Sequence, residues 1–598
     1  MNITQKTDYN SQKKKVMNKN ISKSIRTGFV AMASLLACYS CSDTWDDHYN
    51  PTLDNSTVVD ATIYQQMKTL PELSDFVQII DATGYKALLD ETQIVTVFAP
   101  RNGTFDKEEL LAELAAGNVE LVNTRFVKNH IARYNFSSNT ETQRVELLNK
   151  KLTTLSDGYV GQDSVAIKSK NTICNNGVLH VLESQLPFHA NIYELMETTA
   201  DMDSIYNIFS AYDEDSLDVN RSVYRGVDED GNRIYVDSVM IKTNDLMSRL
   251  YGYMHREDSN YVVIVPSNDA LTERLNETRS YFVYNIHEED RDSLQDYYSR
   301  YYTLNTLIYN NNINLHQNDS LVTTTYSKWD PNYNVFYKPF EQGGLLASDV
   351  VKEKIECSNG IVYTTDKFPS TIYDSFFREI RLECEHTGNI NVEMDDKATP
   401  LFTKTCNYTV TSSNDPTVSN RAYLDVQPST SSAQPYIGFN IPGTLSGEYD
   451  IYLVTVPLKM GRGVLDADTL KPYQFRVNMF YRTNRATDLS ANWPSSKSKT
   501  LTNPDGKNGS NFISNPEKVD TIYLGTEKFT ECYYGSSRAG VMIQIQAYVS
   551  STQTKTYSRR MLLDRIILKP KGMPERGKDA RNEELAGGND VAGDTTEE

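Results

Sequence analysis

Apolar residues recur three and four positions apart near the start of the folded part of the chain. In LPELSDFVQIIDATGYKALL, residues 70–89, this spacing predicts an amphipathic helix with one buried face. NIYELMETTADMDSIYNIFSAY, residues 191–212, opens in a similar way and predicts a second helical segment. The apolar positions of the first segment are Leu70, Leu73, Phe76, Ile79 and Ile80.

From about Cys384 onward, apolar and polar residues alternate with a period of two. Polar turns separate the alternating segments. This pattern predicts half-buried strands, and a series of them predicts an antiparallel sandwich. The expected strands are TCNYTVTSS, AYLDVQPS, YIGFNIPG, GEYDIYLVTVPLK, YQFRVNMFYR, DTIYLGTEKF, GVMIQIQAYVS and MLLDRIILKP.

Two stretches of the chain occur twice in related form. IVTVFAPRNGTF (94–105) parallels YVVIVPSNDAL (261–271), each a strand followed by Pro and a turn containing Asn. ICNNGVLHVLESQLPF (173–188) parallels ECSNGIVYTTDKFPS (356–370), and in both an Asn-Gly pair is expected to supply a positive φ before a strand. Cys174 and Cys357 take equivalent places, which predicts buried core thiols without a redox role.

The repeated motifs resemble the fasciclin domain. TVFAPRNGTF is similar to its first signature and NGVLHVLESQLPF to its second, while FVKNHIARYNFSS, with His130, is similar to the central Tyr-His segment. Asn129 stands where the family has Tyr. The resemblance implies an α+β fold with two fasciclin-like domains, 57–190 and 191–383, the second of them divergent.

The second copy carries an apparent insertion from Asp213 to Asn244. Within it VDEDGNRIYVDS predicts a β-hairpin around Asp230-Gly231. A calcium loop is the alternative, but its Gly would be at the sixth position and here it is at the fourth.

An all-β, jelly-roll-like sandwich is expected to follow, over residues 384–570. GEYDIYLVTVP and the closing LLDRIIL (562–568) resemble strands of galactose-binding-like jelly rolls. Residues 571–598 are rich in Gly, Glu and Asp without apolar periodicity, which predicts a disordered tail.

The amino terminus combines a basic stretch, an apolar run from Gly28 to Ala37 and two cysteines. This arrangement predicts a secretory signal peptide over residues 1–40, and the run is too short to span a membrane. Cys41 is the expected lipid attachment site, with Cys38 as the alternative. The acidic linker 41–56 resembles the export tag of Bacteroidota surface lipoproteins. An ordinary signal peptide with an incidental Cys pair is the competing interpretation.

Composition argues against several classes of partner and ligand. The chain has 60 basic and 79 acidic residues, a net charge of −19, so it lacks the basic footprint of a nucleic-acid-binding protein. Five cysteines remain after the signal peptide, an odd number without CxxC spacing, which argues against a disulfide framework or a zinc site. A Cys384–Cys406 bridge is the alternative. We expect no metal and no cofactor.

Catalytic motifs are absent from the sequence: it has no GxSxG elbow, HExxH helix, phosphate-binding loop or GxGxxG after a strand. His130 is expected to be a packed histidine rather than a base. Trp493, in ANWPSSKSK between two expected strands, is the candidate ligand-binding residue, because a loop indole can stack on a sugar ring. The alternative packs it against the domain edge. Trp329 is expected in the core, and Trp45 has no assigned ligand.

These resemblances imply a lipid-anchored outer-membrane protein, exposed at the cell surface, that binds or adheres without catalysis. Capture of a glycan or matrix ligand beside a SusC/SusD-like uptake system is the expected role. Two alternatives are a structural subunit of an outer-membrane transporter and a hydrolase, which would need two convergent carboxylates beside a cleft.

The lipid anchor can be tested directly. Metabolic labelling with a clickable fatty acid should mark this polypeptide, because acylation of Cys41 or Cys38 attaches the chain to the membrane. A polypeptide that stays unlabelled, or that fractionates with the cytosol, would contradict the assignment.

Overall fold

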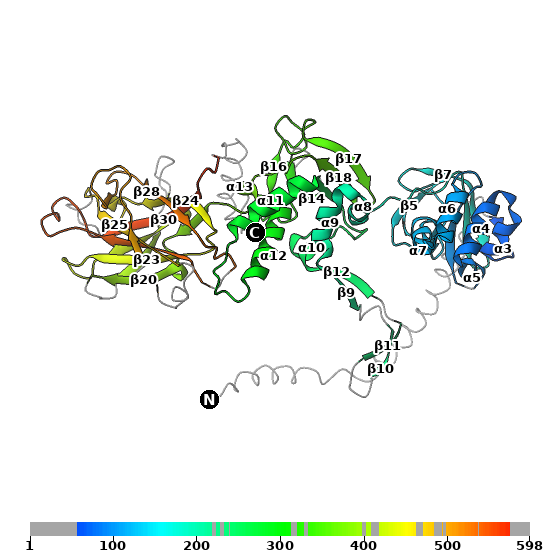
Figure 1. Cartoon of the computed structure of the whole chain (residues 1–598), viewed down its shortest axis with the longest axis horizontal. Coiled ribbons are helices and arrows are strands. Elements are labelled where there is room, and N and C mark those ends of the chain that lie inside the picture. Colours follow the sequence, from blue (N-terminus) through cyan, green and yellow to red (C-terminus); the bar gives the residue numbers. More distant parts are fainter. Residues whose placement is uncertain are drawn as a thin grey trace, which may run out of the picture. The chain divides into compact units, whose positions relative to one another are not determined.

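The computed structural model describes residues 57–574 except 92, 218–222, 228–232, 238–239, 312–319, 328–332, 397–401, 408–417, 462–469, 483–492, 494–497 and 536–537. The expected signal peptide, both candidate anchor cysteines, Trp45, Trp329 and most of the expected tail lie outside these residues. Among the helices described, none is long and apolar enough to cross a membrane. The chain divides into two compact units, Met1–Phe188 and His189–Glu598 (Figure 1).

The first unit is built on one eight-stranded sheet with a parallel pair near one end. Strands β2 (Val95–Pro100) and β8 (Gly177–Leu182) run parallel and are buried along their whole length. The order is β3-β2-β8-β7-β6-β5-β4, with β1 on β7. The remaining strands are β1 (Thr57–Val58), β3 (Ile131–Arg133), β4 (Gln143–Glu146), β5 (Leu152–Ser156), β6 (Tyr159–Val160) and β7 (Val165–Cys174).

Short helices bury their apolar faces in the same core as β2 and β8. The single helix expected over residues 70–89 is divided into three pieces. Leu73, with φ −109° and ψ 5°, separates η1 from α4, and Gly84, with a left-handed φ of 79°, ends α4. The helices described in this unit are α3 (Ile63–Thr69), η1 (Pro71–Leu73), α4 (Ser74–Thr83), α5 (Lys86–Asp90), α6 (Lys107–Ala115), α7 (Val119–Val122), η2 (Asn123–Val127) and η3 (Lys128–His130).

The second copy repeats these pairings in a smaller sheet, ordered β14-β13-β18-β17. β13 (Tyr261–Pro266) and β18 (Gly360–Thr365) are parallel, as β2 and β8 are. β14 (Ile308–Asn310) and β17 (Val351–Cys357) flank them antiparallel. The main helices are α8 (Ile192–Thr198), α9 (Asp203–Ser210), α10 (Asp245–Leu250), α11 (Asn268–Tyr281) and α12 (Arg291–Leu304). The sequence repeat therefore corresponds to a structural repeat.

The Asn of each Asn-Gly pair ties the parallel strands to the first helix of its copy. The buried Asn176 amide donates to two backbone carbonyls, at 2.9 and 2.8 Å, and its oxygen accepts from the Ile63 N–H at 2.8 Å. Asn359 makes the same three bonds, with Met254, Arg256 and Ile192. A buried amide without hydrogen bonds would destabilise the fold. These bonds therefore hold the start of the second parallel strand against the first helix of each copy.

The following glycine is required for a steric reason. Gly177 has φ 143° and Gly360 has φ 148°, which confirms the positive φ expected from the sequence. A Cβ on Gly177 would lie 1.8 Å from the Val95 carbonyl oxygen, and one on Gly360 would lie 2.0 Å from that of Tyr261. The close approach of the parallel strands therefore excludes any side chain here.

The insertion of the second copy forms two antiparallel strand pairs. β9 (Asp213–Leu217) pairs with β12 (Met240–Asn244), and β10 (Val223–Val227) pairs with β11 (Arg233–Asp237). The second pair is the hairpin expected from VDEDGNRIYVDS. Its turn, where a calcium loop was the alternative, lies outside the described residues.

Two six-stranded antiparallel sheets follow. We call β21-β22-β30-β24-β28, with β19 on β30, sheet G, and β20-β23-β29-β25-β26, with β27 on β25, sheet H. Seven of the eight expected segments contain strands whose buried side chains meet in one core, and the eighth, TCNYTVTSS, is described only as far as Asn407, where β21 ends. Sheet G contains β19 (Ile380–Glu383), β21 (Phe402–Asn407), β22 (Ala422–Gln427), β24 (Gly447–Thr455), β28 (Asp520–Phe529) and β30 (Met561–Pro570); sheet H contains β20 (Ile390–Asp395), β23 (Pro435–Ile441), β25 (Gln474–Tyr481), β26 (Ser498–Thr500), β27 (Phe512–Ile513) and β29 (Val541–Ala547).

The boundary expected at 383/384 falls inside this region. β19 precedes it and pairs with β30, so sheet G begins before residue 384. Phe282, Tyr284 and Phe376 of the second copy also belong to the core of the two sheets. At the other end, the Lys571 N–H donates to the Glu448 carbonyl at 2.9 Å, which extends the ordered region into the expected tail.

Four cysteines whose side chains the structure describes are core residues. Cys174, Cys357, Cys384 and Cys532 are buried free thiols. Since Cys384 is free, the alternative bridge to Cys406 is not formed.

Replacing Gly177 should test the close approach of β2 and β8. Gly177→Ala should destabilise the first unit by more than about 3 kcal/mol, because its Cβ would overlap a backbone oxygen. The control Gly103→Ala, with φ 73° and open space around its Cβ, should cost about 1 kcal/mol. Denaturant unfolding of the full chain provides the comparison, and equal losses would refute the steric argument.

Candidate functional site

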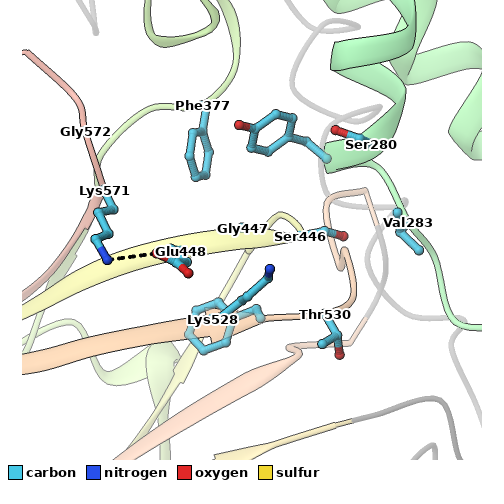
Figure 2. Close-up of a pocket in the computed structure, with 12 residues that line it drawn as sticks. Ser280, Val283, Phe377, Ser446, Gly447, Glu448, Lys528, Thr530, Lys571 and Gly572 are labelled. Carbon is cyan, nitrogen blue, oxygen red and sulfur yellow. Dashed lines mark ion pairs between the residues drawn. The ribbon is translucent and has the colours of Figure 1, made fainter.

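A cavity of about 570 Å³ lies where the end of α11 meets strands of sheet G. We call it the junction pocket (Figure 2). The second copy contributes the end of α11 and the residues after it, and sheet G contributes the first residues of β24 and the last of β28. The lining residues are Ser280, Tyr281, Val283, Phe377, Ser446, Gly447, Glu448, Lys528, Phe529, Thr530, Lys571 and Gly572.

Aromatic rings form one wall of the junction pocket. The centroid of Tyr281, the last residue of α11, lies 4.7 Å from that of Phe377, and Phe377 contacts Tyr449 at 5.1 Å. Tyr449 in turn contacts Phe529 at 5.4 Å. Gly447 is required beside this wall, because a Cβ there would lie 2.7 Å from the Phe377 ring. The wall is therefore fixed by packing.

Charged groups form the opposite side. The Glu448 carboxylate pairs with the Lys571 ammonium at 3.0 Å, which lowers the pKa of Glu448 and raises that of Lys571. Lys528 lies opposite Glu448 across β24 and β28, is exposed, and forms no ion pair with any described residue. The Ser446 hydroxyl is buried, lines the pocket and has no hydrogen-bond partner among the described residues. The pocket thus offers one cation outside the Glu448–Lys571 ion pair, Lys528, whose charge also helps to lower the pKa of Glu448, and one hydroxyl that makes no hydrogen bond to a described residue.

Three carboxylates form a second cluster on sheet G. Oxygens of Glu383, Glu385 and Asp564 lie within 4.8 Å of one another. Asp564 is fully buried on β30, and burial raises its pKa to about 7 although the Ser419 N–H donates to it at 3.1 Å. One oxygen of Glu383 and one of Glu385 are buried without a hydrogen-bond partner among the described residues.

This donor set suits a hard divalent cation such as Ca²⁺, which binds carboxylate oxygens. A cation would satisfy the unpartnered oxygens and offset the repulsion among three acids. Sequence reasoning, which expected no metal, missed the cluster. The signal was Glu-x-Glu at the first strand and Asp in the last, but only the pairing of β19 with β30 brings them together.

Trp493 lies in the chain between β25 and β26 and does not line the junction pocket. The Arg482 guanidinium stacks 4.4 Å from the centre of its half-buried ring. Arg482 is itself held by donation to the Ala539 carbonyl at 3.2 Å. Stacking on a fixed, buried arginine orders the indole.

His130 is fully buried and joins two segments of the first unit. Its Nδ1 lies 2.8 Å from the Phe126 carbonyl oxygen, and its Nε2 accepts from the Leu186 N–H at 2.9 Å. Burial lowers its pKa to about 4, so it is neutral at physiological pH. The contacts are those of the packed histidine expected from the sequence. His180, which the sequence did not single out, is buried in the same way against Phe98.

Comparison with known proteins identifies part of the chain. The fasciclin domain family matches residues 71–187. No curated protein sequence matches the chain. Among solved structures, it is similar to a FAS1 domain pair of the insect cell adhesion molecule fasciclin I, at 12% identity and a TM-score of 0.18, covering 51% of this chain and 98% of that one.

Two other similar structures contain carbohydrate-related proteins. A family 35 carbohydrate binding module from Clostridium thermocellum matches at 10% identity and a TM-score of 0.16, covering 30% of this chain and 95% of that one. Paenibacillus xanthan lyase matches at 10% identity and a TM-score of 0.20, covering 38% of this chain but 18% of the lyase. All these likenesses are too distant to support an assignment of function.

The carboxylate cluster leads to a prediction about calcium and pH. Without a divalent cation, the raised pKa of Asp564 penalises its charged form, so its contribution to stability should fall as pH rises from about 3.8 to about 7. Ca²⁺ at about 100-fold above its Kd should restore about 2.7 kcal/mol. Asp564→Asn should abolish both effects.

Thermal unfolding of the full chain at several pH values, with Ca²⁺ or with a chelator, measures both effects on stability. Asp505→Asn, an exposed acid on a loop of the same region, serves as the matched control and should keep the response. A Tm that is indifferent to Ca²⁺ in the unaltered protein would show that the cluster holds no such cation.

Proposed function

Because residues 71–187 form a fasciclin domain, we propose that the chain is a non-catalytic binding and adhesion protein, held on the outer membrane by a lipid at Cys41 and exposed at the cell surface. The fasciclin match is the observation that carries this proposal. In the solved relative, the FAS1 pair comes from a cell adhesion molecule.

The second unit is suited to presenting a ligand site. Its fasciclin-like copy and the two sheets share one core, so they act as one body rather than as two tethered domains. We take the sheets as a galactose-binding-like sandwich that captures a glycan for a SusC/SusD-like uptake system. The junction pocket supports this role, since aromatic walls with a few polar groups are typical of ligand sites.

A hydrolase is less well supported by the same residues. Glycosidases separate their two carboxyl groups by roughly 5–10 Å beside a cleft. The acids of the cluster lie within 4.8 Å, Asp564 is fully buried, and none of the three lines the junction pocket. Their arrangement favours cation binding over proton transfer.

Glycan binding by the full chain tests the proposal. Trp493→Ala should weaken binding to a glycan array about tenfold, because the ordered indole loses its stacking with the sugar. Trp493→Phe, which keeps an aromatic ring, should retain most of the affinity.

The outcomes separate the alternatives. A chain that binds no glycan but co-purifies with a transporter from native membranes would instead be a structural subunit. Release of reducing ends from a bound glycan would reveal an enzyme and overturn the proposal.

A further inference from the structure

The outer face of sheet G continues away from the junction pocket as an ordered strip of side chains. Along β24, half-buried residues that face outward alternate with buried residues that face the core. Glu448, in the pocket, is followed on the outer face by Asp450 and Tyr452. At about 3.4 Å per residue, Tyr452 lies about 14 Å from Glu448 along the strand.

Strand register places three rows of side chains across this face. Glu448 is flanked by Lys528 and Lys571, Asp450 by Thr526 and Lys569, and Tyr452 by Tyr523 and Ile567. The rows thus change from charged at the pocket to aromatic at the far end. We call this set the β24 strip.

The far end of the β24 strip is an aromatic platform. The rings of Tyr452 and Tyr523 lie 5.3 Å apart, and Tyr523 is 38% exposed. The Tyr523 hydroxyl is 2.7 Å from the Thr526 hydroxyl, which donates to Asp450. This chain of hydrogen bonds orients the Tyr523 hydroxyl and leaves ring surface available for contact.

The charge of the β24 strip limits the ligand. Lys571 forms an ion pair with Glu448, and of the two other lysines of the strip, Lys528 and Lys569, only Lys528 lines the junction pocket. A polyanion would be repelled by a chain of net charge −19, and phosphate recognition favours several donors or an arginine fork. A single carboxylate matches a single lysine.

We propose that the junction pocket and the β24 strip form one binding site for a short oligosaccharide that carries a single carboxylate. The acidic sugar occupies the pocket, where Lys528 pairs with its carboxylate and the buried Ser446 hydroxyl bonds a ring substituent. Neutral sugars then follow β24 to the tyrosine platform. The inference rests on the proposed function only in taking a glycan as the ligand, because Trp493 does not line this pocket and is tested as a separate glycan contact.

Calorimetry with the full chain in detergent tests this site. The probes are glucuronic acid, a trisaccharide ending in glucuronate, and the same trisaccharide with its carboxyl group reduced to an alcohol. The unaltered protein should bind the acidic trisaccharide at least tenfold more tightly than the reduced one. Lys528→Met should remove that preference, whereas Lys555→Met, at an exposed lysine without an ion pair to a described residue, should keep it.

A second variant tests the platform of Tyr452 and Tyr523 separately from the pocket. Tyr523→Ala should weaken binding of the acidic trisaccharide several-fold and leave that of glucuronic acid unchanged, because the monosaccharide reaches only the pocket. Both altered side chains are exposed, so thermal unfolding should match that of the unaltered chain.

The outcomes distinguish this inference from the broader proposal. Glycan binding that is unaffected by Lys528→Met and Tyr523→Ala overturns the site and leaves the proposed function standing. Equal affinity for the acidic and reduced trisaccharides overturns the carboxylate assignment. Glucuronic acid bound through Lys528 by a chain that binds no oligosaccharide supports the pocket and contradicts glycan capture.

Discussion

An aromatic junction between the second copy and the two C-terminal sheets holds the second unit together. Phe282 stacks on Tyr302 at 5.5 Å and packs against Phe376, and the hydroxyls of Tyr302 and Tyr534 are hydrogen-bonded. Aromatic pairs of this kind combine a large buried area with a preferred geometry. The junction pocket exists because these rings fix the end of α11 beside β24, and a flexible linker would give it no constant shape.

Within each copy, the Asn-Gly pair is a second constraint, which fixes the pairing of the parallel strands. Asn-Gly places a buried amide and a residue without Cβ where two parallel strands begin. This explains why Asn176-Gly177 and Asn359-Gly360 make the same contacts although the surrounding side chains have diverged. The second copy could therefore accept a long insertion between Asp213 and Asn244 without losing the central pairing of its sheet.

Local patterns in the sequence predicted much of this fold. Alternation located seven strands that each have one face in the described core, and the repeat located the equivalent parallel pairs β2/β8 and β13/β18. The prediction of a single helix over residues 70–89 was wrong, because the spacing of apolar residues gives no information on the left-handed φ of Gly84, which ends α4. The carboxylate cluster and the junction pocket were missed for a different reason. Glu383 and Asp564 are distant in the chain, and only the antiparallel pairing of β19 with β30 makes them neighbours.

Strand β30 links the two candidate sites. Asp564 near its start belongs to the carboxylate cluster, and Lys571 directly after its end pairs with Glu448 in the junction pocket. Between them, Ile567 and Lys569 flank the outward residues of β24. A cation that neutralises Asp564 would remove the cost of charging a buried acid at one end of this strand and so secure its pairing with β19. Because β30 also forms one side of the β24 strip, the stability of the carboxylate cluster and the shape of the strip depend on the same backbone.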